Sequence, residues 1–379
     1  MKRVLLLLFL LLTMCPSARA EALEGALEQV WDSLPLQEWQ RAYDAAFPEG
    51  EDLRSLSLRL ARGEQALNAE DLLRSLAQRF FSALTGSAWR LARLLAPAVF
   101  CGVLQRLQSS FARPALGGAV NGACFLLLAG CMAQDLGDHM LLSQQAVARM
   151  ADLMQALFPL LLTLLAAVGG TAGAAFFQPA VVAACGTMTA LVRSVSLPLA
   201  LSAGVTAILG RLSPRMKLSR LSGLLKTCAS WTLGVGFTVF ISVTALQSLG
   251  AAAADGVSIR TAKYAVDHFV PVVGGMFADT MDTLVGASLL IKNALGLTGL
   301  VLLLSVAAVP MVQTLAAALL YRACAALLEP LSDARFSGCI QDFSDILMLL
   351  FVIQLSVGAM FLLLVAEMLV VGNLTVMLR

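Results

Sequence analysis

The sequence predicts an all-α fold: a polytopic helical membrane protein with about six to eight spans, some of them short or broken, after an acidic helical segment. Three observations support this fold class. Hydrophobic residues make up 59% of the chain, and charged residues make up only 13%, which is well below the share in soluble domains. Apolar stretches of about twenty residues recur after residue 89. The net charge of +2 conceals an acidic part, because residues 21–88 hold 12 acidic residues against six arginines.

Residues 1–20 are predicted to be a secretory signal peptide that is cleaved after Ala20. The segment has a basic start ("MKR"), an apolar run too short to span a membrane comfortably, and a small-residue ending ("ARA"). Two alternatives remain open, namely a lipoprotein signal ending at Cys15 and an uncleaved N-terminal anchor.

Residues 21–88 are predicted to form short amphipathic helices outside the cytoplasm. Leu53, Leu56 and Leu60 recur at helical spacing, with arginines and acidic residues between them. A secretory signal would place this acidic segment on the extracytoplasmic side. It is either a solvated cap or a docking surface, and its pattern does not separate the two.

Residues 89–379 are predicted to form the polytopic membrane domain, with eight candidate apolar segments at 89–107, 115–134, 153–168, 172–192, 194–209, 228–250, 297–321 and 346–371. The third to fifth are short and are separated by Gly169-Gly170 and by Arg193. A helix of about 16 residues covers ~24 Å, less than the ~30 Å hydrocarbon core. We therefore expect some of these segments to be broken or re-entrant helices.

The orientation of the spans is predicted from the loop at 211–227, which has five basic residues and no acidic one. Cytoplasmic loops are enriched in lysine and arginine, so this loop is expected in the cytoplasm. The same topology places Asp135, Asp138 and Asp152 outside. Loop 322–345 has a mixed charge and does not test the orientation.

The stretch "VPVVGGMFADTMDTLVGASLLIKN" (270–293) carries charged residues between two apolar blocks. On a helical wheel, one line collects Gly275, Asp279, Asp282, Gly286 and Asn293, whereas Lys292 lies off that line. Each charge near the bilayer centre would cost about 2.5–3.5 kcal/mol, so this is not a lipid-facing span. Two interpretations remain. The stretch is either an amphipathic helix on the membrane surface, or a bundle helix whose glycine and aspartate face lines a polar path or another subunit.

Upstream, "DGVSIRTAKY" (255–264) is predicted to be an extracytoplasmic loop with a turn at Asp255-Gly256. Arg260 and Lys263 would make it a solvated loop, with anion binding as the alternative.

The sequence does not predict an enzyme, because it lacks the nucleotide-binding, zinc-protease and serine-hydrolase motifs. We therefore expect no catalytic residue, no cofactor, no metal and no nucleic-acid partner. Two other hypotheses use the same acidic pair. One is a secondary transporter with ion coupling through Asp279 or Asp282, and the other is an intramembrane hydrolase with these two residues as its dyad.

Four stretches resemble the stage III sporulation protein AE family of endospore-forming bacteria. They are "GGTAGAAFFQPAVV" (169–182), "DGVSIRTAKY" (255–264), "FVPVVGGMFADTMDTLVGASLLIKNALGLTG" (269–299) and "GNLTVMLR" (372–379). The family-like residues are Gly169, Gly170, Gln178, Pro179, Asp255, Gly256, Arg260, Thr261, Lys263, Asp279, Asp282, Lys292 and Asn293.

The resemblance implies a multi-pass protein of the mother-cell membrane that surrounds the forespore. It implies a subunit of a secretion-like assembly that forms a channel between the two cells during sporulation. The implied partners are membrane and ring-forming proteins of the same operon, a separately encoded ATPase and a forespore-membrane protein. The resemblance assigns no catalytic role to any residue.

Overall fold

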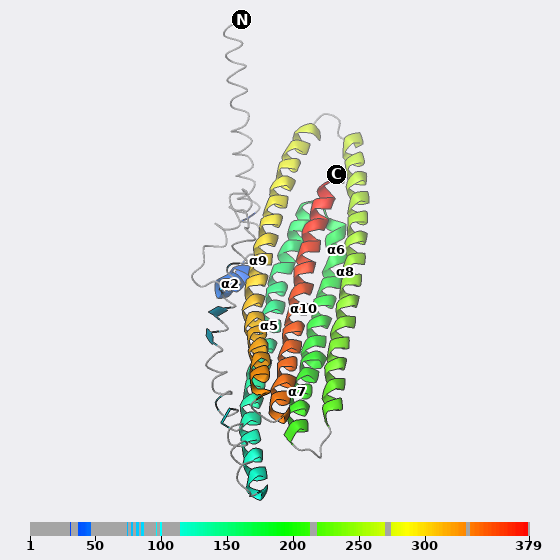
Figure 1. Cartoon of the computed structure of the whole chain (residues 1–379). Coiled ribbons are helices and arrows are strands. Elements are labelled where there is room, and N and C mark those ends of the chain that lie inside the picture. The colour runs from blue at the N-terminus through cyan, green and yellow to red at the C-terminus, as the bar shows by residue number, and fades with distance from the viewer. Residues whose placement is uncertain are drawn as a thin grey trace, which may run out of the picture.

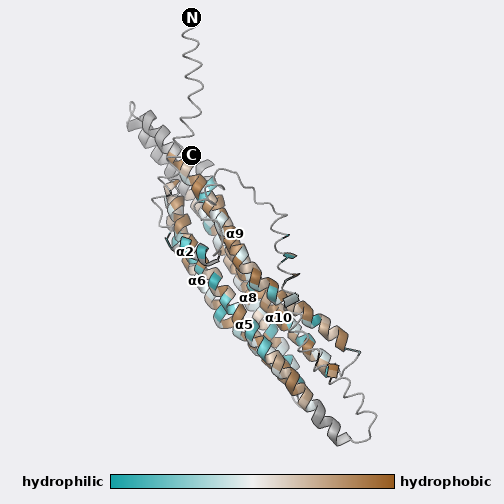
Figure 2. Cartoon of the chain, turned by 90° about the vertical axis from the view of Figure 1, so that its left-hand side faces the viewer, coloured by the Kyte–Doolittle hydropathy of each residue, from teal (hydrophilic) through white to brown (hydrophobic). Residues whose placement is uncertain are grey.

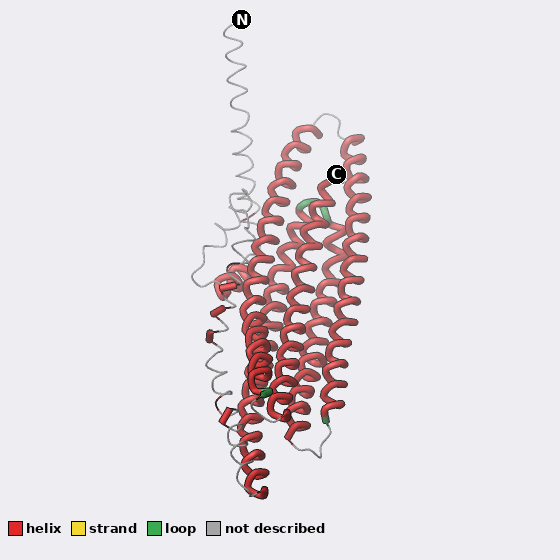
Figure 3. Tube along the Cα trace, in the orientation of Figure 1, coloured by secondary structure: helices red, strands yellow, loops and turns green. Residues whose placement is uncertain are grey.

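The computed structural model describes single residues between 31 and 100 and the ranges 37–46, 114–212, 218–269, 274–330 and 334–377. Every regular element in these ranges is a helix (Figure 3). The long helices run side by side along one axis, and the chain passes from one end of the bundle to the other in successive helices (Figure 1).

One short helix and a bundle of long helices make up the described chain. The short helix is α2 (Gln37–Ala46). The bundle contains α5 (Pro114–Ala167), α6 (Thr171–Leu191), the π-helix η1 (Val192–Ser196), α7 (Leu197–Leu212), α8 (Ser219–Phe269), α9 (Gly274–Leu328) and α10 (Ala334–Met377).

The predicted fold class, a multi-pass helical membrane protein, is confirmed. Five stretches of the described chain are long and apolar enough to cross a membrane: Gly122–Ala167, Thr171–Arg211, Ser219–Ala251, Leu284–Leu328 and Ala334–Asn373. The predicted number of spans also counted segment 89–107, most of which lies outside the described residues.

The bundle is organised around α10, which packs along α9 and also contacts α5, α7 and α8. Buried residues of α10 such as Leu350, Ile353 and Leu364 are completely enclosed. We call one end of the bundle the Arg211 end, because α7 ends there, and we call the other the Gly169 end, after the turn between α5 and α6 (Figure 1).

The predicted break at Gly169-Gly170 is confirmed. Gly169 has a φ of 103°, a backbone conformation that favours glycine, and its amide closes a tight turn onto the carbonyl of Ala166. A Cβ at Gly170 would lie 2.9 Å from the Leu165 side chain, so a larger residue would not fit against the end of α5.

The prediction of two separate spans at 115–134 and 153–168 is wrong, because both belong to the single helix α5. Asp135 accepts a hydrogen bond from Tyr321, next to Arg322 at the Arg211 end. Asp138 and Asp152 lie farther along the same continuous helix. The predicted extracytoplasmic loop therefore does not exist. The polar residues between the apolar segments occupy one face of a helix whose other face is buried.

The expectation of short re-entrant helices between 172 and 209 is also wrong. Arg193 does not interrupt the helix but lies in η1, through which α6 continues into α7. Pro198 is the second residue after η1, and it has no amide hydrogen to donate to a carbonyl one turn back. The backbone adapts by a wider turn, in which the amide of Leu197 donates to the carbonyl of Val192.

Three predicted loops are largely helical. The turn at Asp255-Gly256 is absent, because 255–264 continues α8. Loop 211–227 is shorter than expected, since α8 already begins at Ser219. Most of loop 322–345 belongs to the end of α9 and the start of α10.

The stretch 275–293 is the first part of α9, and its second half is packed in the bundle. Ile291 and Lys292 are buried, and Leu284 packs against the core. A surface helix would expose these side chains, so that interpretation is wrong for 284–293. The side chains of residues 274–283 lie outside the described part of the structure.

The N-terminal predictions fall largely on residues that the structure does not describe. These are the signal peptide 1–20 and most of the acidic segment 21–88. Helix α2 confirms amphipathic helical structure within that segment. Trp39 is buried where α2 contacts α5 and α9, whereas Gln40, Arg41 and Asp44 are exposed.

Candidate functional site: buried polar contacts between the spans

Lys292 is the most deeply buried charged residue that the structure describes. It lies on α9 with 0% of its side chain exposed, and its Nζ donates a hydrogen bond to the backbone carbonyl of Leu369 on α10 at 3.2 Å. It lies inside the spanning segment Leu284–Leu328 but near its end, so its insertion costs less than the about 2.5–3.5 kcal/mol of a lysine at the bilayer centre. An ionisable side chain kept at such a position is a functional-site hypothesis by default.

Gly372 provides the space for Lys292. A Cβ built at this glycine would overlap the Nζ and Cε atoms of the lysine. The absence of a side chain at Gly372 is therefore what allows the lysine to lie between α9 and α10.

Asn293 extends the same contact. Its Nδ2 donates to Oδ1 of Asn373 at 3.1 Å, again between α9 and α10. The Oδ1 atom of Asn293 is buried and receives no hydrogen bond from a described residue. The pairs Lys292-Asn293 and Gly372-Asn373 thus meet across the interface, although they are about 80 residues apart in sequence.

A second polar contact lies deeper in the bundle, around Gln354 of α10. Its Nε2 donates to Oγ of Ser143 on α5 at 2.6 Å and to Oγ1 of Thr314 on α9 at 3.2 Å. Both hydroxyls donate in turn to carbonyls of their own helices, those of His139 and Pro310. One amide therefore joins three helices inside the apolar core.

Glu367 makes a third contact, with α8. Oγ1 of Thr244 donates to its Oε1 at 3.2 Å, while Oε2 is buried and has no hydrogen-bond partner among the described residues. Glu367 of α10 and Lys292 of α9 both lie toward the Gly169 end of the bundle. No ion pair joins them.

Charged residues gather at the Arg211 end. Arg211 of α7 pairs with Asp342 of α10 at 2.8 Å and lies against Gly338, where a Cβ would overlap its guanidinium. Asp345 lies 3.2 Å from Arg322 and 3.6 Å from Lys226. These pairs join the ends of α7, α8, α9 and α10 where the apolar segments stop.

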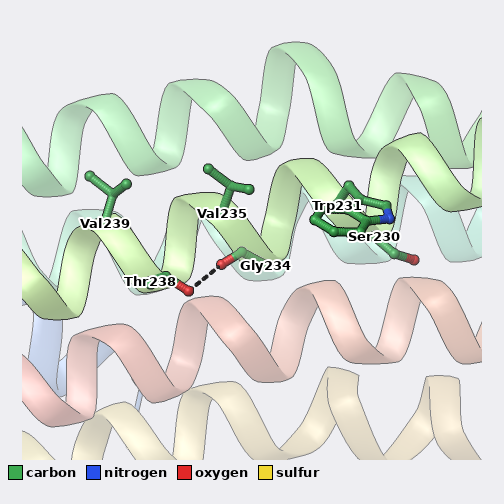
Figure 4. A pocket seen from close by; sticks show the side chains of 6 residues that line it. All are labelled: Ser230, Trp231, Gly234, Val235, Thr238 and Val239. Atoms are coloured by element: carbon green, nitrogen blue, oxygen red, sulfur yellow. Dashed lines mark hydrogen bonds between the residues drawn. The ribbon is translucent and has the colours of Figure 1, made fainter.

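A shallow pocket on α8 has a different character (Figure 4). All its lining residues come from this one helix: Ser230, Trp231, Gly234, Val235, Thr238 and Val239. The hydroxyl of Thr238 donates to the carbonyl of Gly234 at 2.9 Å, so it is satisfied within its own helix. An outward, mostly apolar depression of this kind suits a lipid chain better than a polar ligand.

Comparison with known proteins identifies the family. Residues 52–372 match the family described as Stage III sporulation protein AE. The chain belongs to the Stage III sporulation protein AE family. It is 30% identical over 337 residues to Stage III sporulation protein AE of Bacillus subtilis (strain 168), covering 89% of this chain and 84% of that relative. No solved structure matches.

Only part of the predicted polar line is brought together in this Stage III sporulation protein AE family member. Asn293 contacts α10, and Gly286 is half-buried, with open space where a Cβ would lie. Gly275, Asp279 and Asp282 lie on α9, but their side chains are outside the described residues.

The other family-like residues are distributed over different elements. Gly169 and Gly170 form the turn before α6, and Gln178 and Pro179 are exposed on α6 itself. Five more of these residues lie on α8, and the structure describes their backbone but not their side chains: Asp255, Gly256, Arg260, Thr261 and Lys263.

The site residues predicted from the sequence did not include Gln354, Glu367 or the charged pairs at the Arg211 end. Gln354 and Glu367 are the large polar side chains in the otherwise apolar or small-residue run 346–371, and this pattern is a signal that could have identified them. Within the described residues, no group of three or more His, Cys, Asp or Glu side chains is arranged to hold a metal ion.

Proposed function

We propose that this chain is a membrane subunit of a multi-protein channel or secretion-like complex that links the mother cell and the forespore during sporulation. Family membership over residues 52–372 is the observation that carries the proposal, because it establishes the sporulation context. The polar contacts between the spans support it, since a simple membrane anchor has no need of a buried lysine, a buried glutamine and a partly buried glutamate.

In this proposal the chain lies in the mother-cell membrane around the forespore. The Arg211 end faces the mother-cell cytoplasm, which agrees with the five basic residues in 211–227. The acidic segment 21–88 then lies in the space between the two membranes. There it is available to other components of the complex.

The proposed division of labour assigns no catalytic step to this chain. A separate ATPase supplies energy on the cytoplasmic side, and ring-forming and membrane proteins of the same operon complete the passage. This agrees with a sequence that has no phosphate-binding loop of its own.

Co-purification from sporulating cells tests the proposal. An affinity-tagged chain, extracted in mild detergent after chemical cross-linking, is expected to carry the ATPase and the ring-forming proteins with it. An unrelated multi-pass protein of the same membrane, carrying the same tag, is the control. Recovery of the chain without these proteins, in cells that complete sporulation, would contradict membership in the complex.

A further inference from the structure

The outward face of α5 is polar in the middle of a spanning helix. Seven residues between 134 and 155 are exposed, and only Leu141 among them is apolar. The other six, which we call the α5 polar face, are Gln134, Asp138, Gln145, Arg149, Asp152 and Gln155. Figure 2 shows hydrophilic segments along the bundle where α5 is labelled.

Packing against α10 places the part of this face around Arg149 at the depth of the bilayer centre. The apolar run of α10 covers 346–371, and Gly358 lies at its middle. A Cβ at Gly358 would lie 3.6 Å from Sδ of Met150, which is the neighbour of Arg149 on α5. Arg149 and Asp152 therefore lie near mid-depth, where hydrocarbon would surround any residue that faces lipid.

The outward faces of α8 and α10 at this depth carry no charge, and the span Thr171–Arg211 exposes a single one near its middle, Arg193 of η1. The exposed residues of α10 in 346–371 are Val352, Leu355, Leu363 and Val370. Those of α8 in 228–250 are apolar, small or neutral, and its large apolar ones are Trp231, Val235, Val239, Val243, Leu246 and Leu249. These surfaces suit lipid, whereas the α5 polar face does not.

No described residue neutralises the two central charges. Neither Arg149 nor Asp152 forms an ion pair or hydrogen bond with any described residue. An exposed arginine and aspartate at this depth require either a partner of complementary charge or water.

We propose that the α5 polar face binds the same face of a second copy of this chain. The face carries both signs one helical turn apart, so it is complementary to itself. Two copies inserted in the same orientation would place their α5 helices parallel about a two-fold axis. Three residues rise about 4.5 Å along a helix, so each Arg149 then reaches Asp152 of the other copy.

The glutamines support the same arrangement. Gln145 lies one turn from Arg149 on the same stripe, and Gln155 lies one turn beyond Asp152. Glutamine side chains hydrogen-bond across paired spanning helices, because each amide both donates and accepts. This inference does not depend on the proposed channel function, since it follows from the depth and charge of one helix face.

Cross-linking in native membranes tests the contact. In a chain freed of its eight cysteines, we would introduce Gln145→Cys and treat membranes with a short bis-maleimide that permeates the bilayer. The matched control is Leu355→Cys, which is also exposed and lies next to Gln354, the residue that contacts α5 at Ser143. We expect a product containing two differently tagged copies for Gln145→Cys and none for Leu355→Cys.

Charge exchange gives a second test that does not rely on a single variant. Arg149→Asp makes this turn wholly acidic, and Asp152→Arg makes it wholly basic. Each variant alone is expected to lower the Gln145→Cys cross-link at least about tenfold. Co-expression of the two, each with its own tag, is expected to restore the mixed product to the parental level.

Six results would overturn the proposal. Four are the absence of a two-copy product at Gln145→Cys, an equal yield at Leu355→Cys, a product with a different protein, and no recovery when the two charge variants are mixed. Reaction of Gln145→Cys with a membrane-impermeant reagent, without dimer formation, would show that the face lines water instead. Protection by residues 21–88 of the same chain would appear as an intramolecular cross-link and would equally exclude the second copy.

Discussion

At the residue scale, the contact of Lys292 with α10 depends on the missing side chain of Gly372 as much as on the carbonyl of Leu369. The lysine ammonium has one backbone carbonyl as its acceptor, and Gly372 leaves the space it occupies. Burial of a charged group with so few acceptors is unfavourable in isolation. The surrounding contacts of α9 with α10 must therefore stabilise a site that local energetics disfavour.

We predict that Gly372→Ala destabilises the bundle by about 1–3 kcal/mol, because the added methyl group overlaps the lysine and forces it to move. Thermal unfolding of the purified protein in detergent measures the loss. The control is Gly286→Ala on α9, where a Cβ meets nothing within 4 Å, and this change should stay within about 0.5 kcal/mol. Equal effects at the two glycines would contradict the argument. Restoration by Lys292→Ala in the Gly372→Ala background would support it.

At the element scale, the helices are longer than the sequence segments that predicted them, and buried polar contacts set how they pair. α10 is in contact with α5 and α9 through Gln354, with α8 through Glu367, and with α7 through Asp342. Lipid is as apolar as a leucine-rich helix face, so the hydrophobic effect alone does not select partners within the bilayer. Hydrogen bonds and close packing at glycines do select them.

We predict a coupling of about 0.6 kcal/mol between Gln354→Leu and Thr314→Val in a double-mutant cycle, the average found for hydrogen bonds between spanning helices. Reversible unfolding in mixed micelles is the measurement. Ser356→Ala replaces Thr314→Val in the control cycle, because that hydroxyl donates to Val352 of its own helix. A coupling no larger than in the control cycle would mean that the contact between Gln354 and α9 does not contribute.

At the scale of the whole molecule, the two ends of the bundle differ in chemistry. Ion pairs that include Arg211, Lys226 and Arg322 concentrate at one end, and the glycine turn at 169–170 closes α5 onto α6 at the other. This asymmetry is the physical basis for assigning an orientation, because positive charge is retained preferentially on the cytoplasmic side.

We predict that the Arg211 end is cytoplasmic when the chain is made in vegetative cells. In a cysteine-free chain, a membrane-impermeant maleimide should label Thr171→Cys in intact cells and Arg220→Cys only in inverted vesicles. Both positions are exposed and lie at opposite ends of the bundle. The reversed pattern would invert the topology and would move the acidic segment 21–88 away from its proposed partners.

The sequence by itself determined the fold class and the turn at Gly169-Gly170, and it indicated the stretch around Lys292 and Asn293 as a candidate site. These follow from local composition and spacing, because each span must satisfy its own backbone hydrogen bonds and must be apolar over a fixed length.

Only the tertiary structure decided which apolar segments join into one helix and which polar residues meet. Charged residues between two apolar segments look like a loop until the neighbouring helices show that α5 buries its other face. Gln354 and Ser143 are 211 residues apart, and Lys292 and Leu369 are 77 apart, so no local pattern predicts either contact. The depth of a residue in the bundle also follows only from the tertiary structure. The polar face of α5 is unusual because the exposed faces of α8 and α10 at the same depth are apolar.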